Sequence, residues 1–285
     1  MILTATIGNR TFAVDLTGGH DLSIPLDFHG PQPNAYGVPR AEARTYEDGG
    51  FVGDVRRGGG CNFEAYRLIP HCHGTHTEGV GHIAARRISV HEILDRSLFP
   101  ATLVTLAPED ACATGETYDP DPAPGDRFLT RARLEAALAD ADPAFLEALV
   151  IRTLPNDPHK RFRDYMREPP PFFSLDAMRL LVERGVRHLL LDLPSVDRAL
   201  DEGKLSAHHV FWNVPQGSHE VDPQAFSRKT ITEMIFVDDA IPDGEYLLSL
   251  QMAPFVADAA PSRPWLFPLR LVAGRGIHED ARRSG

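Results

Sequence analysis

The sequence predicts an α/β protein with a large buried core. Segments typical of strands alternate with segments typical of helices through the middle of the chain, and this alternation favours α/β architecture. Hydrophobic residues make up 42% and charged residues 24% of the 285 residues, which are the proportions of a globular protein. A chain of this length fits one large domain or two.

The first part of the chain is expected to be strand and loop. Residues 4–16 alternate apolar and polar side chains around Gly8-Asn9, which predicts a β-hairpin. Residues 21–50 are rich in Pro, Gly and Asn and are expected to form a long irregular loop, a feature that is usually functional in a compact domain. Residues 61–70 suit a strand that leads into a histidine-rich segment.

The remaining elements follow from hydrophobic periodicity. The clearest helix is expected at 174–185, with Ser174 as its N-cap and Gly185 placed to end it. Helices are also expected at 89–97 and 129–141, buried strands at 101–107, 148–153 and 187–195, and a loop rich in Asp and Pro at 117–126. Short strands rich in aromatic or β-branched residues are expected at 207–212, 230–239, 245–255 and 265–274.

Charge and composition argue against several classes of partner. Acidic residues outnumber basic ones, 40 to 29, for a formal charge of -11, so a nucleic-acid partner is not expected. No signal-peptide pattern and no run of about eighteen apolar residues occurs, which predicts a cytoplasmic protein without a membrane partner. Cys61, Cys72 and Cys112 form no paired framework, and a reducing compartment is the simpler interpretation.

One short segment gathers groups that bind metal ions. Residues 71–82, HCHGTHTEGVGH, contain four of the 13 histidines, one of the 3 cysteines and a carboxylate. If this segment is extended, the spacing of two puts His71 and His73 on one face, and its three glycines allow tight turns by which several ligands converge. Imidazole, thiolate and carboxylate are ligands of zinc, manganese and iron, so the segment predicts a metal site rather than a solvated polar loop.

The same segment resembles a known motif. GTHTEGVGH is similar to the His-x-Gly-Thr-His-x-Asp-x-Pro-x-His motif of the cyclase family, which includes bacterial kynurenine formamidase and isatin hydrolase. Other landmarks follow in the family's order over roughly residues 20–270: DLSIPL, ALVIRT, GVRHLLLDLPSVD, AHHVFW and ITEMIF. The resemblance implies one α/β domain over residues 1–272 with a central mixed, barrel-like sheet and surrounding helices, and commonly a homodimer that completes the active site. Residues 273–285 are expected to be a polar tail.

Carried over residue by residue, the resemblance implies two metal sites. The first takes Cys72, His76 and Glu78, and the second shares Glu78 and adds His208 and Glu233. The implied cofactor is a divalent ion, zinc or manganese, with one or two ions per chain. Without the resemblance, His208 would be interpreted as the polar face of a strand, and Glu233 as a buried carboxylate that needs a partner, a metal ion or another group.

The chain departs from the motif at three positions. Cys72 stands where the family has its first histidine, Glu78 replaces Asp, and Val80 replaces Pro. A thiolate is a competent zinc ligand, so the first change would favour zinc over manganese. Alternatively, His71 or His73 takes the vacated position, or only one metal binds.

By the same resemblance the chain is expected to be a metal-dependent hydrolase that cleaves a C–N bond other than a peptide bond. The substrate would be a small cyclic amide or an N-acyl or N-formyl amine, with a metal-activated water as nucleophile and His82 as the catalytic histidine that moves the proton to the leaving nitrogen. The alternatives are a cyclase or dehydratase acting on a carbonyl, an inactive metal- or ligand-binding member, and a zinc-stabilised structural module.

Substrate specificity is expected to lie in two loops. One is the Pro/Gly segment at 28–38, and the other is the stretch between His208 and Glu233, which is longer than the resemblance leads us to expect. Side chains in the second loop either contact substrate or simply pack: Phe211, Trp212 and Phe226. Asp192 and Asp197 are expected to cap or order their loop rather than bind metal.

Overall fold

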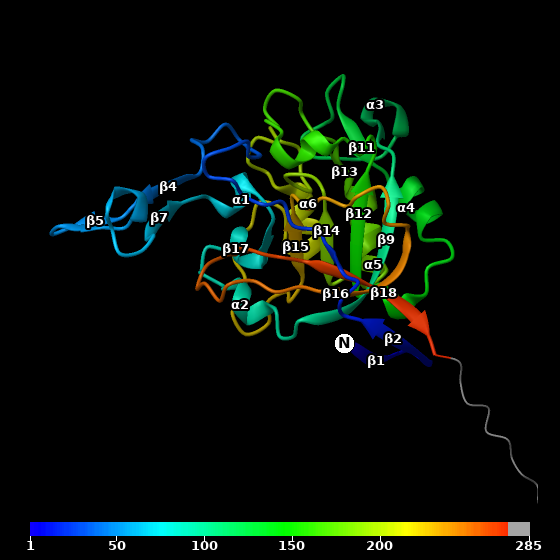
Figure 1. The fold of residues 1–285 in the computed structure, drawn as a ribbon. Helices are drawn as coiled ribbons and strands as arrows, with labels where there is room; N and C mark the ends of the chain where they lie inside the picture. The colour runs from blue at the N-terminus through cyan, green and yellow to red at the C-terminus, as the bar shows by residue number, and fades with distance from the viewer. Residues whose placement is uncertain (273–285) are drawn as a thin grey trace, which may run out of the picture.

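A mixed 11-stranded sheet organises the chain (Figure 1). The structure is a computed structural model and describes residues 1–272. Four central strands run parallel in the order β9 (Leu98–Leu106), β12 (Ala148–Thr153), β14 (His188–Leu191) and β15 (Thr230–Glu233). Every residue of β12 and β14 is buried, as expected of parallel strands covered on both faces, and this is why both read as continuous apolar runs. The predicted α/β class is confirmed.

Antiparallel strands extend the sheet on both sides. Beyond β9 lie β16 (Gly244–Ser249) and β18 (Trp265–Leu271). β18 pairs with β3 (His20–Asp21) and with β2 (Arg10–Asp15), which forms a hairpin with β1 (Ile2–Ile7). The hairpin is the one that the sequence predicted. Beyond β15 lie β8 (His76–Glu78) and β17 (Ala259–Pro261), so the histidine segment sits beside a strand more than 150 residues away in sequence.

Helices cover one face of the parallel strands. α4 (Arg131–Ala137), α5 (Leu175–Glu183) and α6 (Ser206–Trp212) pack against alternate strand residues such as Leu149 and Ile151, while Val150 faces a second apolar cluster on the other side. The predicted caps of α5 are confirmed, because the Ser174 hydroxyl accepts a hydrogen bond from the Ala177 N–H and Gly185 has φ 78°. Among residues 1–272, no helix has the length and apolar character needed to cross a bilayer.

Two local predictions were wrong. Residues 207–212, expected as a strand, form most of helix α6, because the buried Asp197 carboxylate accepts hydrogen bonds from the Ala207 and His208 N–H groups and stabilises the helix start. The loop expected at 21–50 ends early, since β4 (Glu42–Thr45) pairs with β7 (Glu64–Arg67) and β5 (Glu47–Asp48) pairs with β6 (Phe51–Val52).

These two small sheets form an arm, residues 42–67, that extends away from the rest of the chain (Figure 1). The other short elements complete the described fold: η1 (Val55–Arg57), α1 (Pro70–His73), η2 (Val80–His82), α2 (Val90–Ile93), β10 (Glu109–Asp110), α3 (Ala111–Thr114), β11 (Arg127–Leu129), η3 (Pro143–Phe145), η4 (Pro158–Phe162) and β13 (Phe172–Phe173). The tail predicted at 273–285 lies outside the described residues, and the single domain over 1–272 stays a prediction.

Candidate metal centre

Strand pairing brings the first three candidate ligands together. His76 and Glu78 are two residues apart on β8 and therefore share a face, and Glu233 on β15 is the direct cross-strand partner of His76. The intervening Thr77 points the other way and hydrogen-bonds to the hydroxyls of Thr232 and Ser262. His76 Nε2 lies 3.4 Å from Glu233 Oε2, and both side chains are buried.

Helix α1 points the side chains of His71 and His73 in different directions. His71 points into the cluster, with Nδ1 3.0 Å from Glu78 Oε2 and Nε2 2.9 Å from Asp258 Oδ2. His73 points away, where its Nδ1 accepts a hydrogen bond from the Ile69 N–H and its Nε2 donates to the Pro39 carbonyl. Residues 71–73 are therefore not extended, because Pro70 begins a helical turn at this point, and His71 and His73 do not share a face.

Cys72 is buried, but the structure does not bring it into the cluster. None of the groups of ligand atoms that lie within 4.8 Å of one another in the described chain contains its sulfur, whereas His71 groups with His76 and Glu78. Burial, with a contribution from the charge of Glu233, raises the pKa of the Cys72 thiol to about 11, so the thiol is protonated at neutral pH in this structure. Cys72 as a ligand stays a prediction.

A tight turn after β8 places His82. Gly79 and Gly81 flank Val80 in this turn, and a Cβ atom on Gly81 would lie 2.1 Å from the Ile88 carbonyl oxygen. The short turn leaves His82 Nδ1 3.8 Å from Glu78 Oε2 and 3.4 Å from Asp258 Oδ2. Only glycine permits this close approach of the two backbone segments.

His208 enters the cluster from helix α6. Its Nε2 lies 2.8 Å from Glu78 Oε1, and its Nδ1 lies 2.5 Å from Asp197 Oδ2. Burial alone would lower the pKa of His208, but the charges of Glu78 and Asp197 outweigh it and raise this pKa well above its usual value. Burial alone would likewise raise the pKa of Glu78, but His82 and His208 hold it well below the usual range. The carboxylate of Asp197 thus orients the ring of His208 and also caps the start of helix α6.

The cluster contains buried polar atoms without partners. His76 Nε2 and Glu78 Oε2 make no hydrogen bond, since the 3.0 Å contact from His71 Nδ1 to Glu78 Oε2 is not aligned for one. Two ligands about 2.1 Å from a tetrahedral zinc ion are roughly 3.4 Å apart, which is the distance between His76 Nε2 and Glu233 Oε2, so the spacing of this pair suits a cation. Nitrogen and carboxylate donors of this kind suit zinc and manganese.

The structure brings five of the six predicted site residues to one place: His76, Glu78, His82, His208 and Glu233. Their roles as ligands or catalyst stay proposals. Phe211 and Trp212 lie in the apolar core, and Phe226 packs against it. The Trp212 ring also packs against His208, with ring centroids 5.1 Å apart.

Two residues of this centre were not predicted from the sequence. Asp258 lies in an Ala- and Pro-containing segment with no motif, and it reaches His71 and His82 only because the following strand β17 pairs with β8. Tyr36 lies in the Pro/Gly loop, which the sequence did mark as functional, and its side chain lines a cavity of about 280 Å³ with His71, His82, His208 and Glu233.

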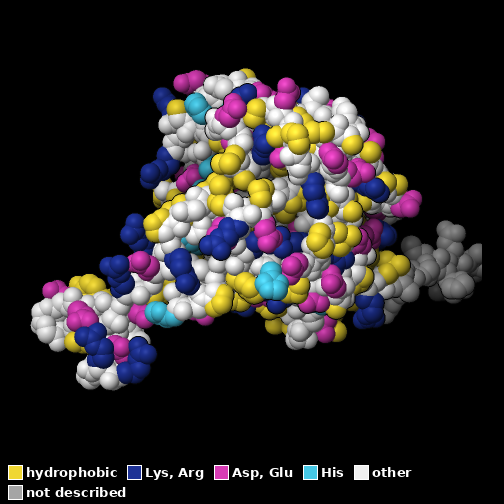
Figure 2. Space-filling model, turned by 90° about the horizontal axis from the view of Figure 1, so that it is seen from above, with side chains coloured by type: hydrophobic (Ala, Val, Ile, Leu, Met, Phe, Trp, Pro, Cys, Tyr) yellow, Lys and Arg dark blue, Asp and Glu magenta, His cyan; other side chains and the backbone are white. Residues whose placement is uncertain are grey.

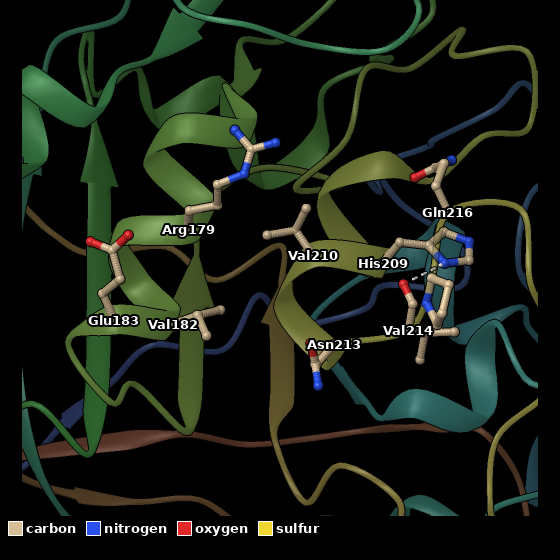
Figure 3. A pocket seen from close by; sticks show the side chains of 9 residues that line it. Arg179, Val182, Glu183, His209, Val210, Asn213, Val214 and Gln216 are labelled. Carbon is tan, nitrogen blue, oxygen red and sulfur yellow. Dashed lines mark hydrogen bonds between the residues drawn. The ribbon is translucent and has the colours of Figure 1, made fainter.

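A second cavity lies apart from these residues. It measures about 580 Å³ and is lined by residues of α5 and α6 and of the loop after α6, including Arg179, Val182, His209 and Gln216 (Figure 3). None of the six predicted site residues lines this cavity. The Nδ1 atom of His209, which does line it, hydrogen-bonds to the Val214 carbonyl. The smaller cavity is the candidate functional site, because the titratable cluster opens into it.

Comparison with known proteins agrees with the motif and the fold. The family model Cyclase, described as "Putative cyclase", matches residues 20–198, more than half of the chain. Kynurenine formamidase of Bacillus cytotoxicus is 32% identical over 125 residues, which are 44% of this chain and 51% of the relative. The formamidase of Bacillus mycoides is 31% identical with the same coverage, so the chain spans about half the length of the curated relatives it matches.

Solved structures extend the likeness over most of the chain. Isatin hydrolase A from Labrenzia aggregata covers 87% of this chain and 93% of its own, with a TM-score of 0.59 at 16% identity. A structure described as a predicted metal-dependent hydrolase from Bacillus stearothermophilus covers 87% and 97%, with a TM-score of 0.54 at 19% identity. At these identities the likeness shows a shared fold. Together with the family model and the motif at 72–82, it leads to one conclusion: the chain belongs to the cyclase family.

Proposed function

We propose that this protein is a metal-dependent hydrolase that cleaves an amide C–N bond, other than a peptide bond, in a small-molecule substrate. The observation that carries the proposal is the buried pair of unpartnered atoms, His76 Nε2 and Glu78 Oε2, inside a cluster of imidazoles and carboxylates. Leaving such atoms bare is unfavourable unless a ligand satisfies them. The relatives named kynurenine formamidase support an amide as the bond that is cleaved.

Two ligand sets share one carboxylate. The first is His71, His76 and Glu78, and the second is Glu78 and His208 with Glu233 beside them. A shared carboxylate holds two ions close together, and the nitrogen-rich donors favour zinc or manganese. The proposed cofactor is therefore one or two divalent ions per chain.

The residues around the ligands transfer a proton and orient the imidazole rings. A divalent ion held here would supply Lewis acidity that polarises a carbonyl and acidifies water. His82, 24% exposed and at the edge of the cavity, transfers a proton to the leaving nitrogen, and Asp258 orients its ring through Nδ1. Asp197 fixes the ring of His208 by the same type of contact.

Metal removal tests this function. Dialysis against a chelator is expected to lower amide hydrolysis by at least about 10³-fold, and addition of zinc or manganese should restore it. Hydrolysis in ¹⁸O-labelled water should place one solvent oxygen in the product, which a cyclase or dehydratase would not do. A metal-free preparation with full activity would refute the proposal. Unfolding of the chain by the chelator, followed by circular dichroism, would indicate instead that the metal is structural.

We also propose that the protein is a homodimer in which the arm packs on a second copy. A two-stranded ribbon is only marginally stable alone. The arm nevertheless exposes the aromatic side chains of Tyr46, Phe51, Phe63 and Tyr66, each by more than 40%, and Figure 2 shows it as a lobe standing clear of the body. Exposed apolar groups grouped on one projection are typical of an interface.

A cytoplasmic location is proposed as well, supported by three free cysteines.

Light scattering tests the dimer. The wild-type chain is expected to have twice the mass of one chain, and the double variant Phe51→Ser/Phe63→Ser is expected to shift to the mass of one chain because it removes two exposed rings of the arm. Leu200→Ser is the matched control, since Leu200 is 70% exposed but lies outside the arm. A wild-type protein with the mass of a single chain would contradict the proposal.

A further inference from the structure

A strained turn lies beside the candidate metal centre. Tyr36 and Gly37 both have positive φ angles, 60° and 64°, and the Asn34 side-chain amide closes the turn by donating to the Val38 carbonyl. Positive φ is common for glycine but disfavoured for a residue with a large side chain. Backbone strain of this kind persists only where surrounding contacts hold it, and it gathers at functional sites.

Three backbone hydrogen bonds hold this turn in place. The Ala35 N–H donates to the Cys72 carbonyl at 3.0 Å, which ties the turn directly to the helix α1 that carries His71. On the other side, the Asn34 N–H donates to the Arg163 carbonyl and the Tyr165 N–H donates to the Asn34 carbonyl. The position of Tyr36 is therefore fixed relative to the cluster.

The side chain of Tyr36 is aimed at the cluster. It lines the cavity of about 280 Å³ together with His71, His82 and Ser195. The residue as a whole is 43% exposed, yet burial of the phenol raises its pKa above the usual value. A tyrosine with a pKa near 10 is already protonated at neutral pH, so the hydroxyl is available there as a hydrogen-bond donor.

We propose that Tyr36 is a further catalytic residue, whose hydroxyl donates a hydrogen bond to the carbonyl oxygen of the substrate as negative charge develops on that oxygen. The inference rests on the proposed hydrolase function. A fixed donor is effective because it needs no reorganisation when the charge appears, and loss of one such donor typically lowers kcat by about 10² to 10³-fold. The strained turn thus has a purpose, which is to keep the donor in place.

Three variants test this role. Tyr36→Phe keeps the ring and removes the hydroxyl, and it is expected to lower kcat by about 10²-fold while changing KM less than about threefold and leaving metal content unchanged. Tyr36→Gly removes the ring together with the strain of the positive φ, and it is expected to lower kcat at least as far. Tyr246→Phe is the matched control, since the Tyr246 hydroxyl donates to the Pro242 carbonyl outside the cluster, and it should leave kcat and KM unchanged.

A binding measurement separates this inference from the hydrolase proposal. Acetohydroxamate offers a carbonyl oxygen to a metal site, and its affinity for the zinc-loaded protein can be measured by titration calorimetry without any turnover. Tyr36→Phe is expected to weaken binding by at least about tenfold, a loss of about 1.4 kcal/mol. Unchanged affinity, or no binding by the wild type, would overturn the role of Tyr36. Weakened binding in a protein that hydrolyses no amide would instead refute only the hydrolase proposal.

Discussion

Glu78→Gln is expected to remove the bound metal and to lower amide hydrolysis by about 10³-fold or more, equivalent to about 4 kcal/mol of transition-state stabilisation. The substitution preserves size but replaces an anionic ligand with a neutral amide. Loss of the negative charge at Glu78 is expected to have a large effect because its two oxygens face different imidazoles. Oε1 lies 2.8 Å from His208 Nε2, and Oε2 lies 3.0 Å from His71 Nδ1. One substitution therefore weakens both proposed ligand sets.

The measurement is metal content by elemental mass spectrometry beside kcat, with circular dichroism to confirm folding. Glu147→Gln is the control, since that carboxylate is partly buried and paired with Arg96 and Arg187 outside the cluster. It should keep both the metal and the rate. A folded Glu78→Gln protein that retains its metal and its turnover would show that Glu78 is not a ligand.

The sequence predicted the central strands because parallel strands that are buried on both faces are continuous apolar runs. The run ALVIRT is buried at all six positions, and the N-capped helix at 174–185 follows from its own residues. The strand assigned to 207–212 failed for a different reason. Its aromatic and β-branched residues suit either element, and the helix forms because Asp197, ten residues earlier, supplies the acceptors for its first N–H groups.

The site was predicted only as far as a motif extends. His76 and Glu78 could be placed on one face because they lie two apart on a strand, but Asp258 is separated from His82 by 176 residues and joins it only through the pairing of β17 with β8. No local sequence pattern predicts a contact between residues so far apart in the chain. The choice between Cys72 and His71 was also beyond the sequence, since it depends on whether 70–73 is extended or helical, and a one-turn helix leaves little periodicity to detect.

His71→Ala is expected to weaken metal binding by about 10²-fold or more, whereas Cys72→Ser is expected to leave metal content and affinity within about threefold of the wild type. In helix α1 the imidazole of His71 reaches Glu78 and the thiol of Cys72 does not belong to any ligand group of the described chain. The neighbouring His73 provides the control, because both of its ring nitrogens are engaged by backbone groups and His73→Ala should affect stability rather than metal content.

Cobalt substitution makes the comparison of His71 with Cys72 decisive. A cysteine ligand gives a sulfur-to-cobalt charge-transfer band in the near ultraviolet, and a site of imidazoles and carboxylates gives none. We expect no such band in the wild type. A band that disappears in Cys72→Ser, together with loss of metal, would show that α1 unwinds on binding and that the metal deprotonates the thiol despite its pKa of about 11. The departure from the family motif would then lie in ligand chemistry. If the band is absent, the difference from the family motif lies in geometry: the ligand is His71, one residue before Cys72 on the same helical turn.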